Sequence, residues 1–336
     1  MYKRLQPVDA ACETAGATTA PGARGEMLVV NKLAGKVEFY RADTQEKLAE
    51  IELPKFPHEV LAAPDTGLAY VSIYGMGLFG KNSEAPGEEV AIIDLATRSK
   101  VGAISTLPYK GPHGMAFDAA GLLWVSCDVS GFIIAIDLAT RGIVTAVPTG
   151  SNGTHWLTIT PDGNKLYASN KTFPDLVVID TRTRELLPKI ALPPGSEGLA
   201  LSPDGKRLYV MGQRPQQFYV IATATDKIID TVPVSVFTPM GEGKNPQKRV
   251  QVSPDGARLV ISSFGGGEIA IVPTGDLRAQ QRMQVEPGPM GITFNGPTRA
   301  YVMNHDAGAI SLIDLENCQV LSRFATAAGP ETMALV

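Results

Sequence analysis

The chain has 336 residues, of which 44% are hydrophobic, and its formal net charge at pH 7 is −4. This charge gives no basic surface for nucleic acid, and no apolar run reaches the length of about 18 residues that would indicate a membrane span. Three cysteines, Cys12, Cys127 and Cys318, are too few and too dispersed to indicate a disulfide framework.

Residues 1–25 are rich in Ala, Thr and Gly and lack the apolar core of a secretory signal. We expect a tail or arm here, followed by one domain over residues 26–336. The protein is expected to be a monomer. We expect it in the cytoplasm because no export signal is present, or in the periplasm if such a signal has been removed.

A short strand pattern that begins at a turn residue recurs seven times along the chain. The copies begin at Pro57-His58-Glu59, Pro112-His113-Gly114, Thr154-His155-Trp156, Ser196-Glu197-Gly198, Gln247-Lys248-Arg249, Pro289-Met290-Gly291 and Pro330-Glu331-Thr332. Four of the six steps between copies are 41 or 42 residues, which is the period of a four-stranded propeller blade. Six copies are followed by a tight turn, often Pro-Asp-Gly, and then by further strands.

The seventh copy, residues 330–336, has no room for a partner strand. Residues 27–32, in contrast, match a second strand that has no first strand before it. Because an unpaired strand edge is a liability, we predict that the C-terminal strand completes the N-terminal blade. The sequence therefore predicts an all-β, seven-bladed β-propeller with four-stranded antiparallel blades.

Two steps are longer, at 55 and 51 residues, because of extra segments within residues 75–89 and 233–247. Successive strands of a blade are antiparallel, so both segments lie on the face where the first strands begin. Long loops on one face of a rigid scaffold commonly carry function. The alternative is that these insertions are tolerated and have no role.

Residues 159–170 and 201–210, with Val-Val-Ile-Asp at 177–180, resemble the repeats of the YVTN family of seven-bladed β-propellers. The resemblance covers residues 26–336 and implies the propeller fold. That family includes binding proteins, lactonase-like members and enzyme subunits, so the resemblance does not select a function. The architecture is also similar to that of virginiamycin B lyase, although the motifs of that enzyme do not match here.

The second residue of each copy is expected to approach the central channel. These residues are His58, His113, His155, Glu197, Lys248, Met290 and Glu331. Three of the four histidines of the chain occupy these seven positions, which favours a functional site. The fourth, His305, ends a second strand and is expected to face the same way.

Three imidazoles and one carboxylate from consecutive blades suit a divalent metal ion, and we predict that His58, His113, His155 and Glu197 bind it. Zinc, iron, manganese, nickel and magnesium remain open, because the residue types do not choose among them. An arc of ligands leaves one side of the ion open, as in catalytic metal sites. In the alternative interpretation, the imidazoles only cap backbone carbonyls around a water-filled channel.

The tips of the second strands add polar and aromatic side chains that suit a small anionic, hydroxylated or aromatic ligand. They are Lys32, Tyr74, Asp128, Lys171, Arg214, Phe264 and His305. We therefore predict a small-molecule metalloenzyme, a lyase or a hydrolase, in which His305 or Lys248 carries protons while Tyr74 and Arg214 contact the substrate.

Two other functions remain open. The first is a non-catalytic propeller that presents its loop face to a ligand or a partner protein. The second is a non-haem iron oxygenase similar to the carotenoid-cleaving oxygenases, which hold iron by axial histidines in a seven-bladed propeller. Elsewhere in the chain, Trp124, Trp156 and Cys127 are expected to be buried packing residues.

Overall fold

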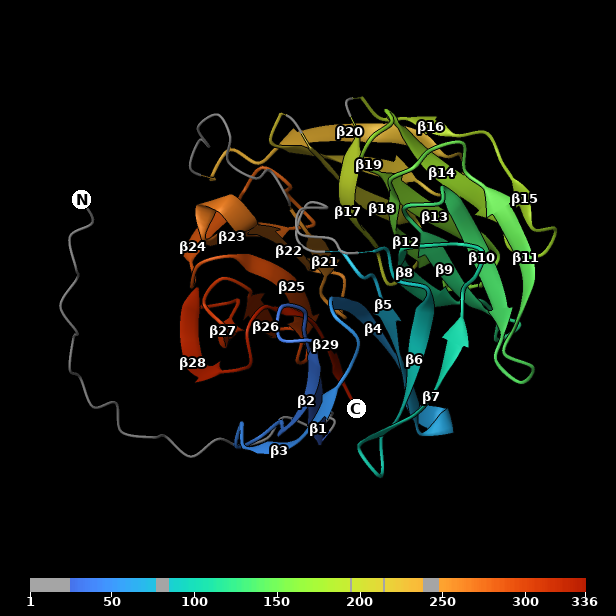
Figure 1. The fold of residues 1–336 in the computed structure, drawn as a ribbon. Helices are drawn as coiled ribbons and strands as arrows, with labels where there is room; N and C mark the ends of the chain where they lie inside the picture. The colour runs from blue at the N-terminus through green and yellow to red at the C-terminus, as the bar shows by residue number, and fades with distance from the viewer. Residues whose placement is uncertain (1–24, 77–84, 194, 214, 238–247) are drawn as a thin grey trace.

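The computed structural model describes residues 25–76, 85–193, 195–213, 215–237 and 248–336. Seven antiparallel sheets are arranged around a common centre (Figure 1). This arrangement confirms the predicted seven-bladed β-propeller. The predicted N-terminal tail lies almost entirely outside the described residues.

Each blade contains four strand positions, counted from the centre outwards. The first strands are β4 (Pro57–Ala63), β8 (Pro112–Phe117), β12 (Thr154–Ile159), β17 (Ser196–Leu201), β21 (Val250–Val252), β25 (Pro289–Phe294) and β29 (Pro330–Leu335). The second strands are β5 (Leu68–Ile73), β9 (Leu123–Cys127), β13 (Lys165–Asn170), β18 (Arg207–Gly212), β22 (Arg258–Ser263), β26 (Arg299–Asn304) and β1 (Glu26–Asn31).

The third strands are β6 (Glu89–Asp94), β10 (Phe132–Asp137), β14 (Asp175–Asp180), β19 (Gln217–Ala222), β23 (Glu268–Pro273), β27 (Ala309–Asp314) and β2 (Lys36–Arg41). The fourth positions hold β7 (Ser99–Ser105), β11 (Gly142–Pro148), β15 (Glu185–Leu186) with β16 (Ile190–Ala191), β20 (Lys227–Pro233), β24 (Gln281–Gln284), β28 (Gln319–Ala325) and β3 (Lys47–Glu52). Two short 3-10 turns are also present, at Pro64–Thr66 and Phe264–Gly266.

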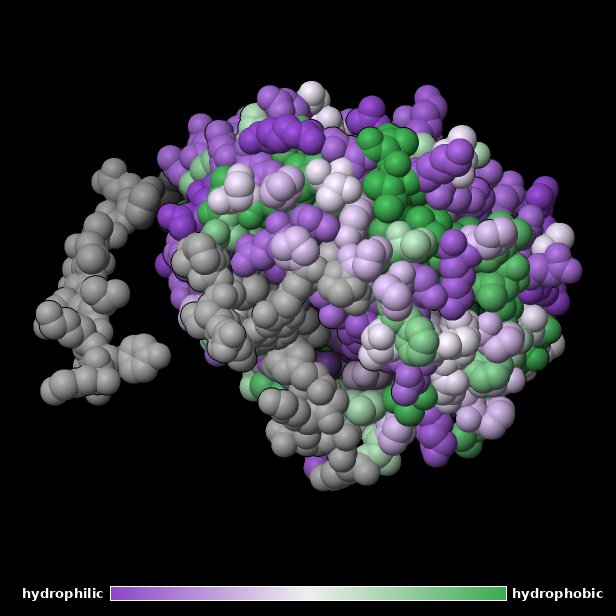
Figure 2. Space-filling model, turned by 90° about the horizontal axis from the view of Figure 1, so that it is seen from above, coloured by the Kyte–Doolittle hydropathy of each residue, from purple (hydrophilic) through white to green (hydrophobic). Residues whose placement is uncertain are grey.

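The burial of the strands explains their composition. The second and third strands are buried on both faces, because each blade packs against its neighbours, and they are nearly continuous runs of apolar residues. The outer strands alternate between exposed and partly buried residues, as in β28. The face of the molecule shown in Figure 2 is mostly hydrophilic, with hydrophobic residues in separate small areas.

The last strand closes the ring as predicted. Strand β29 pairs antiparallel with β1, and the C-terminus lies beside that blade (Figure 1). Beyond the paired strands, the backbone N–H groups of Glu26 and Val336 each donate to the other's carbonyl oxygen, at 3.1 and 2.9 Å. Arg98 in the neighbouring blade donates two hydrogen bonds to the Glu26 carboxylate, which ties the closed blade to the next one.

The first strands carry an irregularity that shapes the channel. Between the pairs Pro57↔Ile73 and Val60↔Val71 the register shifts, so that two residues of β4 oppose Ser72 alone. The same shift occurs in β8, β12, β17, β25 and β29. In β4 the freed N–H group of the second bulged residue donates to the Ser72 hydroxyl at 3.1 Å. The bulges in β4, β8, β12, β17 and β25 therefore release two successive residues from the regular alternation beside the channel, and the bulge in β29 releases Glu331.

No helical turn in the described parts of the chain has the length or apolarity needed to cross a bilayer.

Candidate metal centre in the channel

Three histidines from consecutive blades meet at the end of the channel where the first strands begin. The ring centroids of His58 and His113 are 4.0 Å apart, and those of His113 and His155 are 3.6 Å apart. All three rings are buried. The bulges in β4, β8 and β12 place them there, because each histidine is the first of the two bulged residues.

Three ring nitrogens of His58 and His113 have no role in the described fold. Both nitrogens of His113 and the Nδ1 of His58 are enclosed and have no hydrogen-bond partner among the described residues. The Nδ1 of His58 lies 3.3 Å from Glu59 Oε1 and 3.4 Å from Glu331 Oε1, but the angles are not those of a hydrogen bond. Burial lowers the pKa of both histidines well below the usual value, and repulsion from Lys32 adds to this for His58. Both rings are therefore neutral near pH 7.

These side chains fit a divalent metal ion. One ligand atom from each of His58, Glu59 and His113 lies within 4.8 Å of the other two. Neutral imidazole nitrogens and a carboxylate are the donors that zinc and the neighbouring transition metals take in proteins. Buried imidazole nitrogens without a partner are costly unless something binds them. The three residues could therefore hold a metal ion.

His155 is in a different situation. Its Nδ1 lies 3.0 Å from Asp128 Oδ2, and its Nε2 lies 3.3 Å from Glu197 Oε1. Both nitrogens face carboxylates, so the ring bridges Asp128 and Glu197 and has no nitrogen to spare. The four predicted ligands therefore divide into two groups, His58 with His113 and His155 with Glu197.

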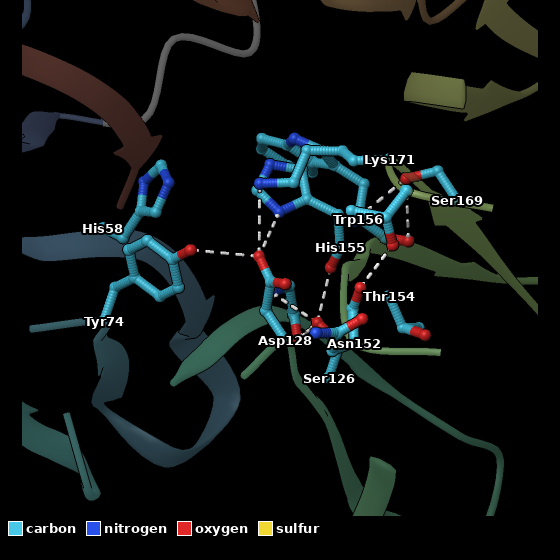
Figure 3. A network of polar contacts seen from close by, with 12 residues as sticks. His58, Tyr74, Ser126, Asp128, Asn152, Thr154, His155, Trp156, Ser169 and Lys171 are labelled. Atoms are coloured by element: carbon cyan, nitrogen blue, oxygen red, sulfur yellow. Dashed lines mark hydrogen bonds and ion pairs between the residues drawn. The ribbon is translucent and has the colours of Figure 1, made fainter. Parts of the chain in front are cut away.

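Asp128 collects three partners on one carboxylate oxygen. The Tyr74 hydroxyl donates to Oδ2 at 3.0 Å, and Lys171 Nζ lies 3.2 Å from the same atom, beside His155 (Figure 3). Burial would raise the pKa of Asp128, but Lys171 and His155 outweigh burial and hold that pKa below its usual value. Burial also raises the pKa of Tyr74, so its hydroxyl remains a donor. In Figure 3 the Tyr74 ring lies between His58 and Asp128.

Arg249 crosses the channel directly behind the histidines. Its Nη2 lies 2.8 Å from Glu331 Oε1 and 3.3 Å from Glu59 Oε1, and its guanidinium lies 4.3 Å from the centre of the Trp156 ring. Burial raises the pKa of Glu59 to about 8, although Arg249 opposes this. The expectation that Trp156 is only a packing residue is incomplete, because its ring also faces the channel beneath Arg249.

Sequence reasoning missed Glu59, Trp156 and Arg249 as channel residues. Each is the residue after an expected channel position, and a regular strand would turn it away from the axis. A signal was present when the copies are compared with one another. The residue at the same position in three other copies is glycine: Gly114, Gly198 and Gly291. A Cβ atom at these glycines would lie 2.9 Å or less from a neighbouring strand, so only three blades have room for a large side chain here.

A cavity of about 450 Å³ continues from this point along the channel, towards the face opposite the first-strand entrances. Glu59, Trp156 and Arg249 line its inner end, and apolar residues of the first strands line its walls. The histidines lie beyond these three side chains and do not line the cavity.

The remaining predicted site residues are in several places. His305 is buried with its Nε2 3.6 Å from Glu331 Oε2, and its Nδ1 lies 3.0 Å from Asp306 Oδ1. Lys248 and Met290 are buried at the entrance of their strands. Arg214 lies outside the described residues, as do residues 77–84 and 238–247, which make up most of the two predicted insertions.

Comparison with known proteins supports the fold. Neither a family model nor a curated protein sequence matches the chain, so the YVTN resemblance has no independent support. A chain of the Kuenenia stuttgartiensis hydrazine synthase is similar in structure, with a TM-score of 0.72, 18% identity and coverage of 91% of this chain and 99% of that one.

Two further structures are similar. The periplasmic gluconolactonase of Pseudomonas aeruginosa has a TM-score of 0.74 and 19% identity, over 93% of this chain and 98% of that chain. A functionally unknown protein from Desulfotomaculum acetoxidans has a TM-score of 0.70 and 12% identity, over 93% and 98%. At these identities the similarity establishes the seven-bladed propeller alone.

Proposed function

We propose that the protein is a metal-dependent hydrolase that acts on a small polar substrate at the end of the channel where the histidines meet. One observation carries the proposal: His58 and His113 present buried, neutral nitrogens that have no hydrogen-bond partner in the described parts of the chain, beside the carboxyl group of Glu59. Metal ligands must be deprotonated to bind, and both rings already are. A bound divalent ion would polarise a substrate carbonyl or lower the pKa of a water molecule.

The residues around this cluster have distinct roles in the proposal. His155 stays between Asp128 and Glu197 and holds both carboxylates in place, so it supports the site instead of binding the ion. The Tyr74 hydroxyl is oriented by Asp128 and is available to a polar group of the substrate. We rank hydrolysis above a lyase reaction because one structural neighbour is named as a gluconolactonase.

Elemental analysis of protein purified without an affinity tag tests the proposal. We expect about one divalent ion per chain, and a loss of that ion in His58→Ala and in His113→Ala. His305→Ala is the comparison variant, since His305 lies outside the group of His58, Glu59 and His113, and it should retain the ion. Wild-type protein without stoichiometric metal, which also fails to take up zinc, manganese, iron, nickel or magnesium on dialysis, would overturn the proposal.

A non-catalytic ligand-binding propeller is the second candidate. It is favoured by the internal pairing of Arg249, Glu331, Asp128 and Glu197, which leaves the fold with much of its channel charge already satisfied. Full function of His113→Ala together with absence of metal would support this candidate over the enzyme.

A further inference from the structure

Lys32 is a buried cation that forms no ion pair with any described residue. It follows β1 directly and lies at the tip of the closed blade, on the same face as the histidines. The residue is 2% exposed, and its Nζ lies 5.3 Å from the centre of the Tyr74 ring. Across the part of the chain that the structure describes, its ammonium group has no hydrogen bond and no ion pair. Burial lowers the pKa of Lys32 to about 8, although attraction to the more distant carboxylates of Glu331 and Glu59 opposes this.

Other cations of the site differ from Lys32 in this respect. Arg249 contacts the carboxylates of Glu331 and Glu59, and Lys171 contacts that of Asp128. Proteins seldom bury a charge without pairing it, because the loss of hydration is not repaid. An ammonium kept without a partner in the fold is therefore free to pair with a group that arrives with a ligand.

The position of Lys32 relates it to the metal-capable cluster. The Tyr74 ring that it approaches is 5.4 Å, between centroids, from the ring of His58 and 5.2 Å from that of His113. A small molecule whose anionic group rests on Lys32 would extend across Tyr74 towards these two histidines.

We propose that Lys32 binds a carboxylate group of the substrate and so fixes one end of that molecule beside His58 and His113. The proposal rests on the proposed function, because the carboxylate belongs to a molecule that reacts at the same site. One ammonium group that has no ion pair among the described residues matches a single negative charge. A phosphate dianion would leave a surplus of negative charge in a desolvated place, so a carboxylate is favoured.

Lysine-selective NMR on the full chain tests this assignment. With lysine labelled at the ε carbon, the Lys32 signal is the one absent from Lys32→Met. We expect a saturable shift of that signal with propionate, at least roughly tenfold weaker binding of inorganic phosphate, and no saturable shift with the neutral analogue propionamide. An unresponsive Lys32 signal, or phosphate binding as tightly as propionate, would overturn the proposal.

Melting temperatures of Lys32→Met and of a control variant, measured with and without propionate, complete the test. Lys32→Met should raise the melting temperature, because a neutral side chain of similar length replaces an unpaired charge, and propionate should no longer raise it further. Lys189→Met, which removes a lysine paired with Asp175, should keep the response to propionate. If Lys32→Met lowers stability, the ammonium has a partner within the fold and the proposal is wrong.

Metal content measured on the same samples distinguishes a failure of the carboxylate site at Lys32 from a failure of the proposed metal-dependent hydrolase. Protein without metal whose Lys32 still binds propionate would contradict the metal-dependent hydrolase and leave the carboxylate site intact. Protein that contains metal but whose Lys32 signal does not shift with propionate would contradict only the carboxylate site.

Discussion

Glu38 shows how one buried carboxylate secures the closed blade. It lies in β2 and accepts hydrogen bonds from the Tyr40 hydroxyl at 2.7 Å, from Lys47 Nζ at 2.7 Å and from the backbone N–H of Ala327 at 2.9 Å. Ala327 belongs to the segment that leads from β28 to β29. A residue near the N-terminus thus fixes the chain just before its last strand, 289 residues further on.

Replacement of Glu38 by Gln is expected to lower the free energy of unfolding by about 1–3 kcal/mol at pH 7. Burial would raise the pKa of Glu38, but its hydrogen-bond donors outweigh burial and bring that pKa below the usual 4.5. A folded-state pKa below the unfolded one stabilises the fold above pH 4.5, and this contribution disappears as pH falls through the folded-state value. Wild type and Glu38→Gln should therefore converge below about pH 4.5.

Urea denaturation of both proteins between pH 3 and pH 7 measures this difference. Glu52→Gln is the control, because the Glu52 side chain is 83% exposed and its removal should change little. A wild-type advantage that stays constant down to pH 3 would contradict the assigned role of the ionised carboxylate.

Individual site residues were predictable only in part. The repeat placed His58, His113 and His155 at equivalent positions, and the structure brings them together. Sequence could not reveal that His155 is held between two carboxylates, because Asp128 belongs to a different blade from Glu197. The contact between Arg249 and Glu59 joins residues 190 positions apart, and no local pattern indicates such a pairing.

At the scale of a strand, side-chain hydroxyl groups connect the first strands of neighbouring blades. The hydroxyl groups of Ser126, Ser262 and Thr332 each donate to a backbone carbonyl of the next blade. These contacts hold adjacent first strands together, and they require a small residue where the strands come nearest. Gly291 occupies one such place, between β25 and β29.

We expect Gly291→Ala to destabilise the protein by about 1–3 kcal/mol, because the added Cβ would lie 2.4 Å from the backbone oxygen of Glu331 and the two strands would have to separate. Thermal denaturation checks this. Gly275→Ala is the matched control, since nothing lies within 4 Å of its added Cβ, and the change should stay within about 0.5 kcal/mol. Equal melting temperatures for the two variants would contradict the proposed close approach.

Strand order was predictable because the repeat of 42 residues recurs with the same sequence of strands and turns. Boundaries were accurate to about a residue: the expected second strand at 27–32 is observed at Glu26–Asn31. The division of one fourth strand into β15 and β16 was not foreseen. Pro188 lies between them and has no N–H group to donate, so pairing with β14 is interrupted there.

At the scale of the whole molecule, ring closure by β29 could be predicted because the strand count left one strand unpaired at each end. The same strand contributes to the channel. Glu331 contacts Arg249 and His58, and Thr332 donates to the carbonyl oxygen of His58 at 2.7 Å. Stability of the ring and geometry of the site are therefore linked through one short segment.

Deletion of residues 330–336 is expected to lower the melting temperature by about 10 °C or more, because it opens the edge of β1 and removes the partners of Arg249 and His58. Circular dichroism measures the transition. A synthetic peptide of residues 330–336 should restore part of the loss when added in excess, whereas a peptide of scrambled sequence should not. A melting curve unchanged by the deletion would refute the closure.

The mutual backbone bonds of Glu26 and Val336 also constrain how the protein is made. During translation, β1 to β3 leave the ribosome before the other strands, and their neighbour β29 emerges after every other strand of the propeller. At about 5–20 residues per second, the interval lasts roughly 15–60 s. Throughout that time the nascent chain carries an open sheet edge on β1, because the ring can close only after β29 has emerged.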